Sequence, residues 1–403
     1  MVAHVANGAL IQADDAARVR WDAIVIGAGP AGSLAACLLA RERLKVLLAE
    51  RQFLPRSKVC GGCVNARALA SLDRAGLAAR VRALGAREVH RLSLRHRGRT
   101  AAIDLPPGLA VSRRALDEAL ARAAAEAGAA LMTGTLAVVV PEAQATANDG
   151  LRYVALHQRE GPEVRISARV VVSADGLAHT SLRECAPMTS LLSPASRVGI
   201  GGETAPGAVE VEPGTITMAI GRHGYVGAVE VEGGRINIAA ALDPESLRSG
   251  FTAAGAVKAV LSEAGVGTSP ALDAVEWKGT IPLTRRLARP AARGLFVIGD
   301  AAGYVEPFTG EGMAWALAGA EAAMPFVRRA LEPHGRALED EWVREYNRVV
   351  GREQRRCRAI ARLLRRPALV TLLVALLGRH PGLARPVLAR FAPPSTPGSE
   401  RID

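Results

Sequence analysis

The stretch Trp21–Glu50, WDAIVIGAGPAGSLAACLLARERLKVLLAE, decides the fold of this 403-residue chain. Ala23–Ile26 is a short apolar run, which is typical of a strand buried on both faces of a sheet. Gly27, Gly29 and Gly32 follow it at the G-x-G-x-x-G spacing. In that spacing the first glycine permits a tight turn, the second lets a phosphate approach the backbone, and the third lets a helix pack against the strand.

A helix and a second strand complete this unit. Ala31–Ala40 consists of small, apolar, helix-forming residues, and Lys45–Ala49 reads as the second strand. Glu50 ends that strand, where a carboxylate can accept hydrogen bonds from ribose hydroxyl groups. The helix start offers free N–H groups and a positive dipole end to a diphosphate. The sequence therefore predicts a dinucleotide site that contains Gly27, Gly29, Pro30, Ala31, Gly32, Glu50 and Arg51.

A second glycine-rich segment lies more than 250 residues further on, at Gly294–Leu317, GLFVIGDAAGYVEPFTGEGMAWAL. It reads as a buried strand that ends in Gly299-Asp300, followed by a glycine-rich approach to a helix at Met313–Ala323. A carboxylate at the carboxyl end of a parallel strand lies at the ligand crevice of such a sheet. Together the two segments indicate one long cofactor, and they favour FAD over NAD.

Composition excludes several classes of protein. The net charge is +12, but the basic residues are spread along the chain and aromatic residues make up only 3%, so we expect no nucleic-acid binding. Five cysteines in a chain of this length do not predict a disulfide framework, and no second ligand pair accompanies the single C-x-x-C, so we expect no metal site. Residues 1–20 lack the pattern of a signal peptide, and the apolar run Pro367–Gly378 is too short to span a bilayer. We expect a cytoplasmic protein.

The rest of the chain alternates between helical and strand-like patterns. Helices are expected at Ala66–Leu77, at Ser112–Gly128 with Ser112 as its cap, and at Ala254–Ala264, with a loop at Phe53–Asn65. Strands are expected at Leu92–Leu105, Leu136–Val140, Leu151–Leu156, Val164–Ser173, Ala208–Met218, Tyr225–Val231 and Arg235–Ala241. We predict an α/β protein: an FAD-binding Rossmann-like three-layer domain, an antiparallel substrate-domain sheet and C-terminal helices. Its expected parts are a flexible extension (1–20), an FAD-binding domain in two pieces (21–185 and 289–330, with 86–108 a candidate for the substrate domain), a substrate domain (186–288), and a C-terminal helical region with a tail (331–403).

Four motifs carry a resemblance to a known family. They are GAGPAG with Glu50, the Ala174-Asp175-Gly176 segment after a strand, Gly299-Asp300 followed by PFTGEG, and KVCGG at 58–62. The first three, over residues 21–320, resemble FAD-dependent oxidoreductases of the aromatic-hydroxylase fold, and KVCGG resembles the geranylgeranyl reductase-like group among them. The resemblance implies that FAD is the cofactor and that the flavin ring lies between the nucleotide domain and the substrate sheet.

The resemblance also implies roles for single residues. Asp300 would hold a ribityl hydroxyl, Asp175 would shape the diphosphate region, and Arg113 would reach the phosphates or the adenine, with Arg114 as its rival one position on. Backbone N–H groups at the helix start after PFTGEG would face the flavin pyrimidine carbonyl and stabilise negative charge on it. The implied cofactor contacts in that region are Gly299, Gly310, Glu311, Gly312 and Met313.

The motif Cys60-Gly61-Gly62-Cys63 has several interpretations. Taken alone, C-x-x-C is a redox dithiol or half of a metal site. The resemblance has this loop pass the flavin ring, with Cys60, Gly61 and Gly62 as contacts; an added thiol role and simple packing remain open. Lys58, in the same loop, is a candidate for orienting the substrate or polarising the flavin, and the alternative is a surface lysine.

Two departures from the family bear on the substrate. The Tyr-x-Trp-x-Phe-Pro motif of isoprenoid reductases is matched at Tyr225, but Gly227, Val229 and Glu230 replace its other members, which argues against a long polyprenyl substrate. The stretch Trp277–Pro282, WKGTIP, lacks the second tryptophan of the flavin halogenase motif Trp-x-Trp-x-Ile-Pro, which argues against a halogenase.

We therefore expect an FAD-dependent oxidoreductase, namely a reductase or dehydrogenase that transfers hydride to an apolar lipid-like or polyketide metabolite, with Lys58, Cys60 and Tyr225 near the flavin. One alternative is an FAD-dependent monooxygenase acting on an aromatic or polyketide substrate, and a remote third is a non-catalytic flavin-binding module. The electron donor is expected to be NADPH or NADH docking transiently, or a partner protein. Residues 352–390 mix arginine clusters with an apolar run, so they predict a packed helix, the wall of a lipid-sized cavity, or peripheral contact with an anionic membrane surface.

Overall fold

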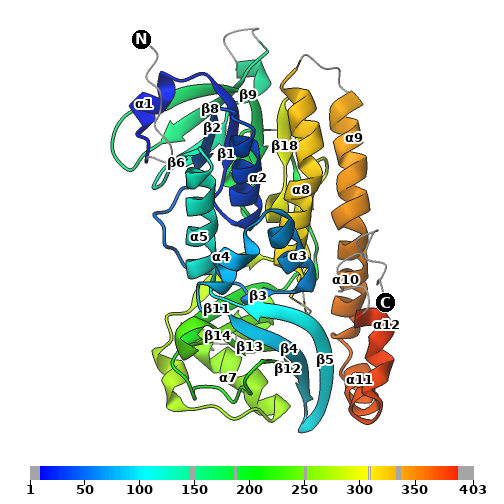
Figure 1. Ribbon diagram of the computed structural model, residues 1–403. Coiled ribbons are helices and arrows are strands. Elements are labelled where there is room, and N and C mark those ends of the chain that lie inside the picture. The colour runs from blue at the N-terminus through cyan, green and yellow to red at the C-terminus, as the bar shows by residue number, and fades with distance from the viewer. Residues whose placement is uncertain are drawn as a thin grey trace, which may run out of the picture.

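The computed structural model describes residues 10–144, 150–185, 188–248, 252–306, 308, 310–332 and 337–388. Two large sheets lie one above the other, and long helices run along one side of both (Figure 1). The upper sheet contains the glycine-rich strand–helix–strand unit, and the lower sheet contains most of the strands between residues 198 and 282. The predicted α/β architecture, with a nucleotide-binding sheet and a second, mainly antiparallel sheet, is confirmed.

The first sheet has a parallel core of five strands. Its order is β18 (Leu295–Val297), β9 (Val164–Ser173), β1 (Trp21–Ile26), β2 (Val46–Ala49) and β6 (Ala130–Met132), with β17 (Ala291–Ala292), β7 (Leu136–Val139) and β8 (Arg152–His157) added antiparallel. The segment around β18 returns from more than 120 residues downstream to pair with Val171–Ser173, as the buried run in the sequence predicted. Thus two remote parts of the chain build one sheet.

Three helices form a layer against this sheet. They are α2 (Pro30–Arg41), α5 (Arg113–Glu126) and α8 (Gly312–Ala330), and α2 lies between the other two (Figure 1). The α2 helix can pack closely because its inner surface is alanine and leucine; Leu34, Ala35 and Leu39 are fully buried. Ser112 caps α5 by accepting a hydrogen bond from the Ala115 backbone N–H at 3.1 Å, which confirms the predicted cap.

The second sheet has eight strands. Their order is β15 (Lys278–Pro282), β11 (Val198–Thr204), β14 (Ile236–Leu242), β13 (Gly224–Glu230), β12 (Thr215–Gly221), β4 (Arg87–His96), β5 (Arg99–Ala110) and β3 (Cys63–Val64). All neighbours are antiparallel except β12 and β4, which are parallel. The structure thus places the segment 87–110 in the second sheet. Helix α7 (Ala253–Ala264) covers one face, where it packs on residues such as Val226 and Ile238, and alternate residues on these strands, such as Tyr225, pack with Phe308 and the C-terminal helices.

The C-terminal part is helical. Helices α9 (Ala337–Tyr346), α10 (Arg352–Leu363) and α11 (Pro367–Arg379) follow one another down the side of the molecule, and α12 (Arg385–Leu388) lies above α11 (Figure 1). Short elements complete the described fold: α1 (Ala13–Ala17), α3 (Ala66–Arg74), α4 (Ala78–Arg82), α6 (Pro244–Arg248), and a small sheet of β10 (Ser190–Leu192), β16 (Arg285–Leu287) and β19 (Gly303–Tyr304).

Three local expectations need correction. The flexible extension expected over 1–20 is wrong for Ala13–Ala17, which forms a helix with Ala16 fully buried and its carbonyl accepting a hydrogen bond from the Trp21 indole at 3.0 Å; residues 1–9 lie outside the described part. The strand expected at Ala208–Met218 begins only at Thr215, because Pro213 and Gly214 turn the chain before it. The loop expected up to Asn65 ends in β3, which pairs with β5.

Candidate active site

The glycine-rich turn leaves one open position. Gly27 has a φ of +104°, and a Cβ atom there would lie 2.5 Å from the Ala174 carbonyl oxygen. A Cβ on Gly32 would lie 1.9 Å from the Gly27 carbonyl oxygen. A Cβ on Gly29, in contrast, would meet only the Arg113 and Arg56 guanidinium groups, at 3.4 and 3.9 Å. Two of these glycines therefore serve the fold, and Gly29 provides room in front of the α2 N-terminus.

A polar cavity lies in front of this turn. It is lined by Gly27, Gly29, Glu50, Arg51, Asp175 and Asp300, all of which the sequence predicted as cofactor contacts, and also by Arg56 and Lys58. These residues come from the ends of β1, β2, β9 and β18, because the carboxyl ends of parallel strands meet at one edge of a sheet. The α2 helix begins at this cavity without a side-chain cap, so its first N–H groups are available to an anion.

Glu50 is held in place by three donors. Its carboxylate accepts hydrogen bonds from the Ala28 and Gln52 backbone N–H groups, both at 3.0 Å, and from Arg56 at 3.1 Å. A carboxylate has about four acceptor positions, so one remains for a further donor such as a ribose hydroxyl. Glu50 is buried, and the contacts keep its side chain in one orientation at the end of β2.

The helix α5 directs Arg113, and not Arg114, toward the polar cavity. Arg113 is buried and makes a bidentate ion pair with Asp117 at 2.8 and 2.7 Å, whereas Arg114 is exposed. Asp117 also binds Arg56 at 3.0 Å, so one fully buried carboxylate holds two guanidinium groups beside Gly29. Burial lowers the pKa of Arg113, but Asp117 more than compensates, so that this pKa is raised above its ordinary value. The pair therefore supplies fixed positive charge next to the helix N-terminus.

Lys58 and Asp175 have different surroundings in the same cavity. Burial lowers the pKa of Lys58, as does Arg113, while Asp300, 3.9 Å away, opposes this effect. Lys58 lines the polar cavity, and it is not among the residues that line the neighbouring apolar cavity. The Asp175 carboxylate accepts hydrogen bonds from Ser181 N–H at 2.7 Å and from Ser173 Oγ at 3.2 Å, so it fastens the loop that forms the cavity wall.

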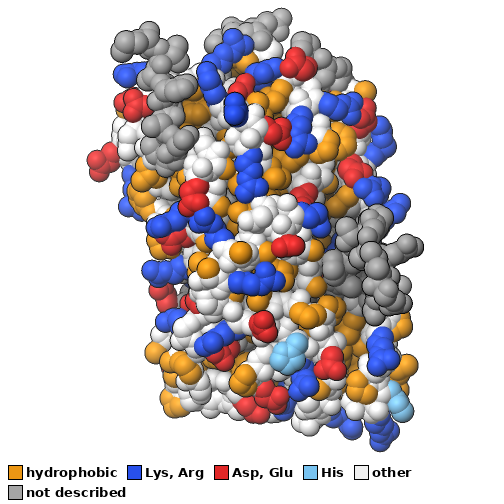
Figure 2. Space-filling model, viewed as in Figure 1, with side chains coloured by type: hydrophobic (Ala, Val, Ile, Leu, Met, Phe, Trp, Pro, Cys, Tyr) orange, Lys and Arg blue, Asp and Glu red, His pale blue; other side chains and the backbone are white. Residues whose placement is uncertain are grey.

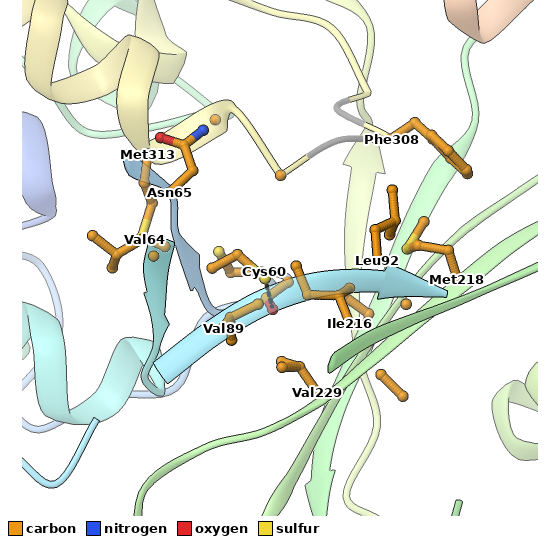
Figure 3. Close-up of a pocket in the computed structure, with 18 of the residues that line it drawn as sticks. Cys60, Val64, Asn65, Val89, Leu92, Ile216, Met218, Val229, Phe308 and Met313 are labelled. Atoms are coloured by element: carbon orange, nitrogen blue, oxygen red, sulfur yellow. Dashed lines mark hydrogen bonds between the residues drawn. The ribbon is translucent and has the colours of Figure 1, made fainter. Parts of the chain in front are cut away.

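An apolar cavity continues from the polar one toward the second sheet. The two share Val59, Leu283 and Tyr304 in their linings. Figure 3 shows Val64 and Met313 at one end of it and Leu92, Met218 and Phe308 at the other, with Cys60 between them. Val89, Ile216 and Val229 of the second sheet form a further part of the wall. The predicted residues Cys60, Gly61, Tyr225, Gly310, Gly312 and Met313 all line this cavity.

The two cysteines of the C-x-x-C motif differ in environment. Cys63 is buried in β3, where burial, and after it Cys60, raises the pKa of its thiol to about 12. Its thiol donates a hydrogen bond to the Gly61 carbonyl at 3.3 Å, so it stays protonated at neutral pH. Asn237 donates a hydrogen bond to the Cys60 carbonyl at 2.9 Å and fixes the loop. A thiolate at Cys63 is therefore disfavoured, and the geometry argues against a redox dithiol.

Tyr225 lies at the aromatic end of the apolar cavity. Its ring contacts Phe308 edge-on, with ring centres 5.1 Å apart, and the Arg197 guanidinium lies 5.5 Å from its centre. Burial, and after it Glu306, raises the pKa of Tyr225 well above its ordinary value, so the phenol is protonated. The cavity lining contains no histidine and no carboxylate among the described residues. Asn65 and the two tyrosines are its main polar side chains.

Seven predicted contacts are not among the residues lining either cavity: Pro30, Ala31, Gly32, Gly62, Arg113, Gly299 and Glu311. Gly299, for example, contributes to packing next to the cavity. A Cβ on Gly299 would lie 3.0 Å from Ala31 Cβ, so this glycine lets the chain pass close to α2. Within PFTGEG, Pro307 and Thr309 lie outside the described residues.

Sequence reasoning missed Arg56, Asp117 and Asn237. Arg56 is one of 51 basic residues, and no local signal separates it from the others. Asp117 stands four residues after Arg113, and that spacing on a helix is the signal that could have found the pair. Asn237 alternates with apolar residues in β14, and the position of a strand relative to a distant loop is not visible in the sequence.

The two connected cavities fit FAD, the cofactor that the motifs imply. The open position at Gly29, the uncapped α2 N-terminus and the Arg113 guanidinium suit a diphosphate, and Glu50 retains an acceptor position for a ribose. Tyr304 and Leu283 adjoin both cavities, so a molecule that extends from the polar into the apolar cavity passes them.

Comparison with known proteins agrees with this picture. The chain is 35% identical to a menaquinone reductase of Mycobacterium tuberculosis over 162 residues, which are 38% of the chain and only 37% of that relative's length. It is 26% identical to digeranylgeranylglycerophospholipid reductase 1 of Methanopyrus kandleri over 81% of the chain and 87% of the relative.

A solved structure, a geranylgeranyl bacteriochlorophyll reductase-like protein of Thermoplasma acidophilum, has a TM-score of 0.74 to this chain at 19% identity, over 92% of this chain and 95% of that one. At this identity the likeness shows the fold alone. The sequence model of the FAD binding domain family matches residues 20–324, about three quarters of the chain. This chain therefore belongs to the FAD binding domain family, the family of FAD-dependent oxidoreductases that its motifs resemble.

Proposed function

We propose that this protein is an FAD-dependent reductase or dehydrogenase that acts on an apolar lipid-like or polyketide metabolite. The bound cofactor would supply hydride chemistry. The single observation that carries the proposal is the apolar cavity that continues from the dinucleotide cavity and shares Val59, Leu283 and Tyr304 with it. The reductase names of the relatives support the reaction class, because those proteins are a menaquinone reductase and a digeranylgeranylglycerophospholipid reductase.

In this proposal the chain's residues bind and orient the two reactants. The α2 N-terminus and Arg113 would hold the diphosphate, Glu50 a ribose, and Asp300 the ribityl chain. Gly310, Gly312 and Met313 would lie against the flavin ring at the start of α8, where the positive end of the helix dipole favours negative charge. These assignments agree with the positions of the residues at the two cavities.

The apolar cavity would select the substrate. Its valine, leucine, isoleucine and methionine side chains exclude water and offer few hydrogen-bonding groups, so an uncharged hydrocarbon body gains most from binding there. Gly227 and Val229 stand where isoprenoid reductases carry bulky aromatics. The Met218 side chain occupies the space beside Gly227, where a Cβ would lie 2.9 Å from its Sδ, and Tyr225 lines the same cavity. Reducing equivalents would come from NADPH or NADH docking transiently, or from a partner protein.

A second candidate is an FAD-dependent monooxygenase on an aromatic or polyketide substrate. Tyr225 and Phe308 pack edge-on at one end of the apolar cavity, and Tyr304 also lines it, so the cavity offers edge and face contacts to an aromatic ring. This observation favours an aromatic substrate but says nothing of oxygen. We rank it second because the KVCGG loop, with Cys60 in the cavity lining, resembles the reductase group.

The two candidates differ in the atoms that the substrate gains. The FAD-loaded protein would be reduced with NADPH or with dithionite that does not exceed the bound flavin, without oxygen, and incubated with two probes, geraniol and a menaquinone with a short side chain. Mass spectrometry that finds two added hydrogen atoms without oxygen supports the reductase. Product that forms only with oxygen and contains one added oxygen atom contradicts it and supports the monooxygenase. Omission of FAD is the control in both arms.

A further inference from the structure

Helix α11 has two faces with different surroundings. Val370, Val374 and Leu377 are buried, at 1%, 0% and 8% exposed, where they pack against β4 and β5. Leu369, Leu372 and Leu376 are on the opposite side and are 43%, 65% and 43% exposed, and Leu383, after the helix, is 53% exposed. We call these four leucines the outer leucine face. Packing of a helix against the rest of the protein, one of the expectations for residues 352–390, therefore explains the buried side of α11 but not its exposed leucines.

The buried side fixes this helix firmly on the second sheet. Gly378 lies so close to β5 that a Cβ there would be 2.7 Å from the Thr100 carbonyl oxygen. Thr371 Oγ1 lies 3.0 Å from His96 Nε2 of β4 and donates to the Pro367 carbonyl at 2.9 Å. The outer leucine face is consequently held in a defined position, and no conformational change is needed to expose it.

The segment that carries the outer leucine face has charged residues of one sign. Residues 354–388 contain eight arginines and no aspartate or glutamate. Four of these arginines are exposed close to the leucines: Arg362, Arg366, Arg379 and Arg385. Hydrophobic side chains lie beside basic ones at the lower right of Figure 2, where Figure 1 places α11 and α12. An apolar face with a basic border is the pattern of a protein surface that lies on an anionic bilayer.

The same segment also forms part of the apolar cavity. Leu388, the last residue of α12, lines that cavity together with Leu92, Met218 and Phe308. Leu364, Ala384 and the buried side of α11 belong to the same hydrophobic cluster as these cavity residues. One hydrophobic cluster therefore joins the buried side of α11 to residues that line the cavity.

We propose that the protein docks on an anionic lipid bilayer through the outer leucine face and its arginine border, with α11 lying in the plane of the membrane surface. None of the helices in the described ranges is long and apolar enough to cross a membrane. Insertion of the leucines would bring the α12 end of the apolar cavity to the bilayer surface, so that a membrane-dissolved substrate reaches it without passing through water. The docking itself stands on the surface alone, and the substrate route rests on the proposed function.

The test uses the full-length, FAD-loaded protein and vesicles in a sedimentation assay. We expect binding to vesicles of phosphatidylglycerol mixed with phosphatidylcholine, and roughly tenfold weaker binding to phosphatidylcholine alone or at high salt. The double substitution Leu372→Glu, Leu376→Glu should lower binding by roughly tenfold or more, because it places charge in the apolar layer. Leu192→Glu, at an equally exposed leucine of β10, is the matched control and should bind like the unchanged protein.

A second pair of variants separates charge from apolar contact. The double substitution Arg366→Glu, Arg379→Glu should weaken binding to the anionic vesicles strongly, while Arg159→Glu, an exposed arginine in the β8–β9 turn, should not. All these positions are exposed, so thermal unfolding temperatures should stay close to that of the unchanged protein, which checks that each variant is folded.

Three results would overturn the docking proposal. They are no binding to anionic vesicles, equal binding by the Leu372/Leu376 and Leu192 variants, and light scattering that shows a dimer which the Leu372/Leu376 variant abolishes. The last result would assign the face to a second copy of the chain. Because sedimentation needs no turnover, its failure is distinguishable from failure of the proposed function: loss of vesicle binding with intact reduction of a detergent-dispersed probe rejects docking alone, and vesicle binding without reductase activity rejects the function alone.

Discussion

The substitution Gly29→Ala should separate cofactor binding from folding. Gly29 has φ −83° and ψ −177°, an extended conformation that alanine adopts without strain, and its added Cβ would meet only guanidinium groups at 3.4 and 3.9 Å. We therefore expect the free energy of unfolding of the FAD-free protein to change by less than about 1 kcal/mol. The methyl group would, however, occupy the space through which a diphosphate approaches the α2 N-terminus.

The expected loss of affinity follows from the hydrogen bonds at stake. Removing about two hydrogen bonds from backbone N–H groups to a charged phosphate costs about 3 kcal/mol, which is on the order of 100-fold in the dissociation constant of FAD. Titration of the FAD-free protein, followed by flavin fluorescence, measures this constant, and urea unfolding measures the stability.

Two glycines provide controls for this experiment. Gly382→Ala, whose Cβ meets no heavy atom within 4 Å and which lines neither cavity, should leave both affinity and stability unchanged. Gly32→Ala should prevent folding, because its Cβ would lie 1.9 Å from a backbone oxygen. An affinity of Gly29→Ala within about twofold of the unchanged protein would refute the placement of the diphosphate at this turn.

Three further predictions concern stability and thiol chemistry. Asp117→Ala should lower the free energy of unfolding by about 3–5 kcal/mol in urea titrations, because it leaves the buried Arg113 guanidinium without its carboxylate and removes one of the two carboxylate partners of Arg56, whereas Glu118→Ala, on the exposed side of the helix, should have little effect. Burial, and after it the charge of Arg285, lowers the pKa of His179 in the folded protein, so the protein loses stability as the pH falls below about 6.5, the pKa of histidine in an unfolded chain. Between about pH 7.5 and 5.5 the melting temperature should therefore fall less steeply for His179→Asn than for the unchanged protein. Equal slopes for the two proteins would contradict this reasoning. A thiol reagent at about pH 8 should modify Cys60 rapidly in the folded, FAD-free protein and the four buried cysteines slowly; Cys60→Ser should remove the fast phase.

Local patterns predicted the strand–helix–strand unit well. The glycines of this unit lie within a few residues of one another. Ser112 likewise caps α5 through Ala115, three residues away, so both features can be predicted from short stretches of sequence. The expectations from sequence were wrong where contacts between distant residues override the local pattern of apolar and polar residues. Ala13–Ala17 is ordered because it packs on the sheet, and the stretch before Thr215 turns although its residues alternate like a strand.

The sequence by itself determined the strand–helix–strand unit that contains Gly27, Gly29, Gly32 and Glu50, since those residues must follow one another at fixed spacing along the backbone. Only the tertiary structure decided that Arg113 and not Arg114 lies buried beside Gly29, because the rotation of α5 against the sheet sets which side chain points inward. It also decided that remote strands, the Cys60 loop and Leu388 surround one apolar cavity, because side chains from segments more than 300 residues apart meet there only after the two sheets and the C-terminal helices have packed together.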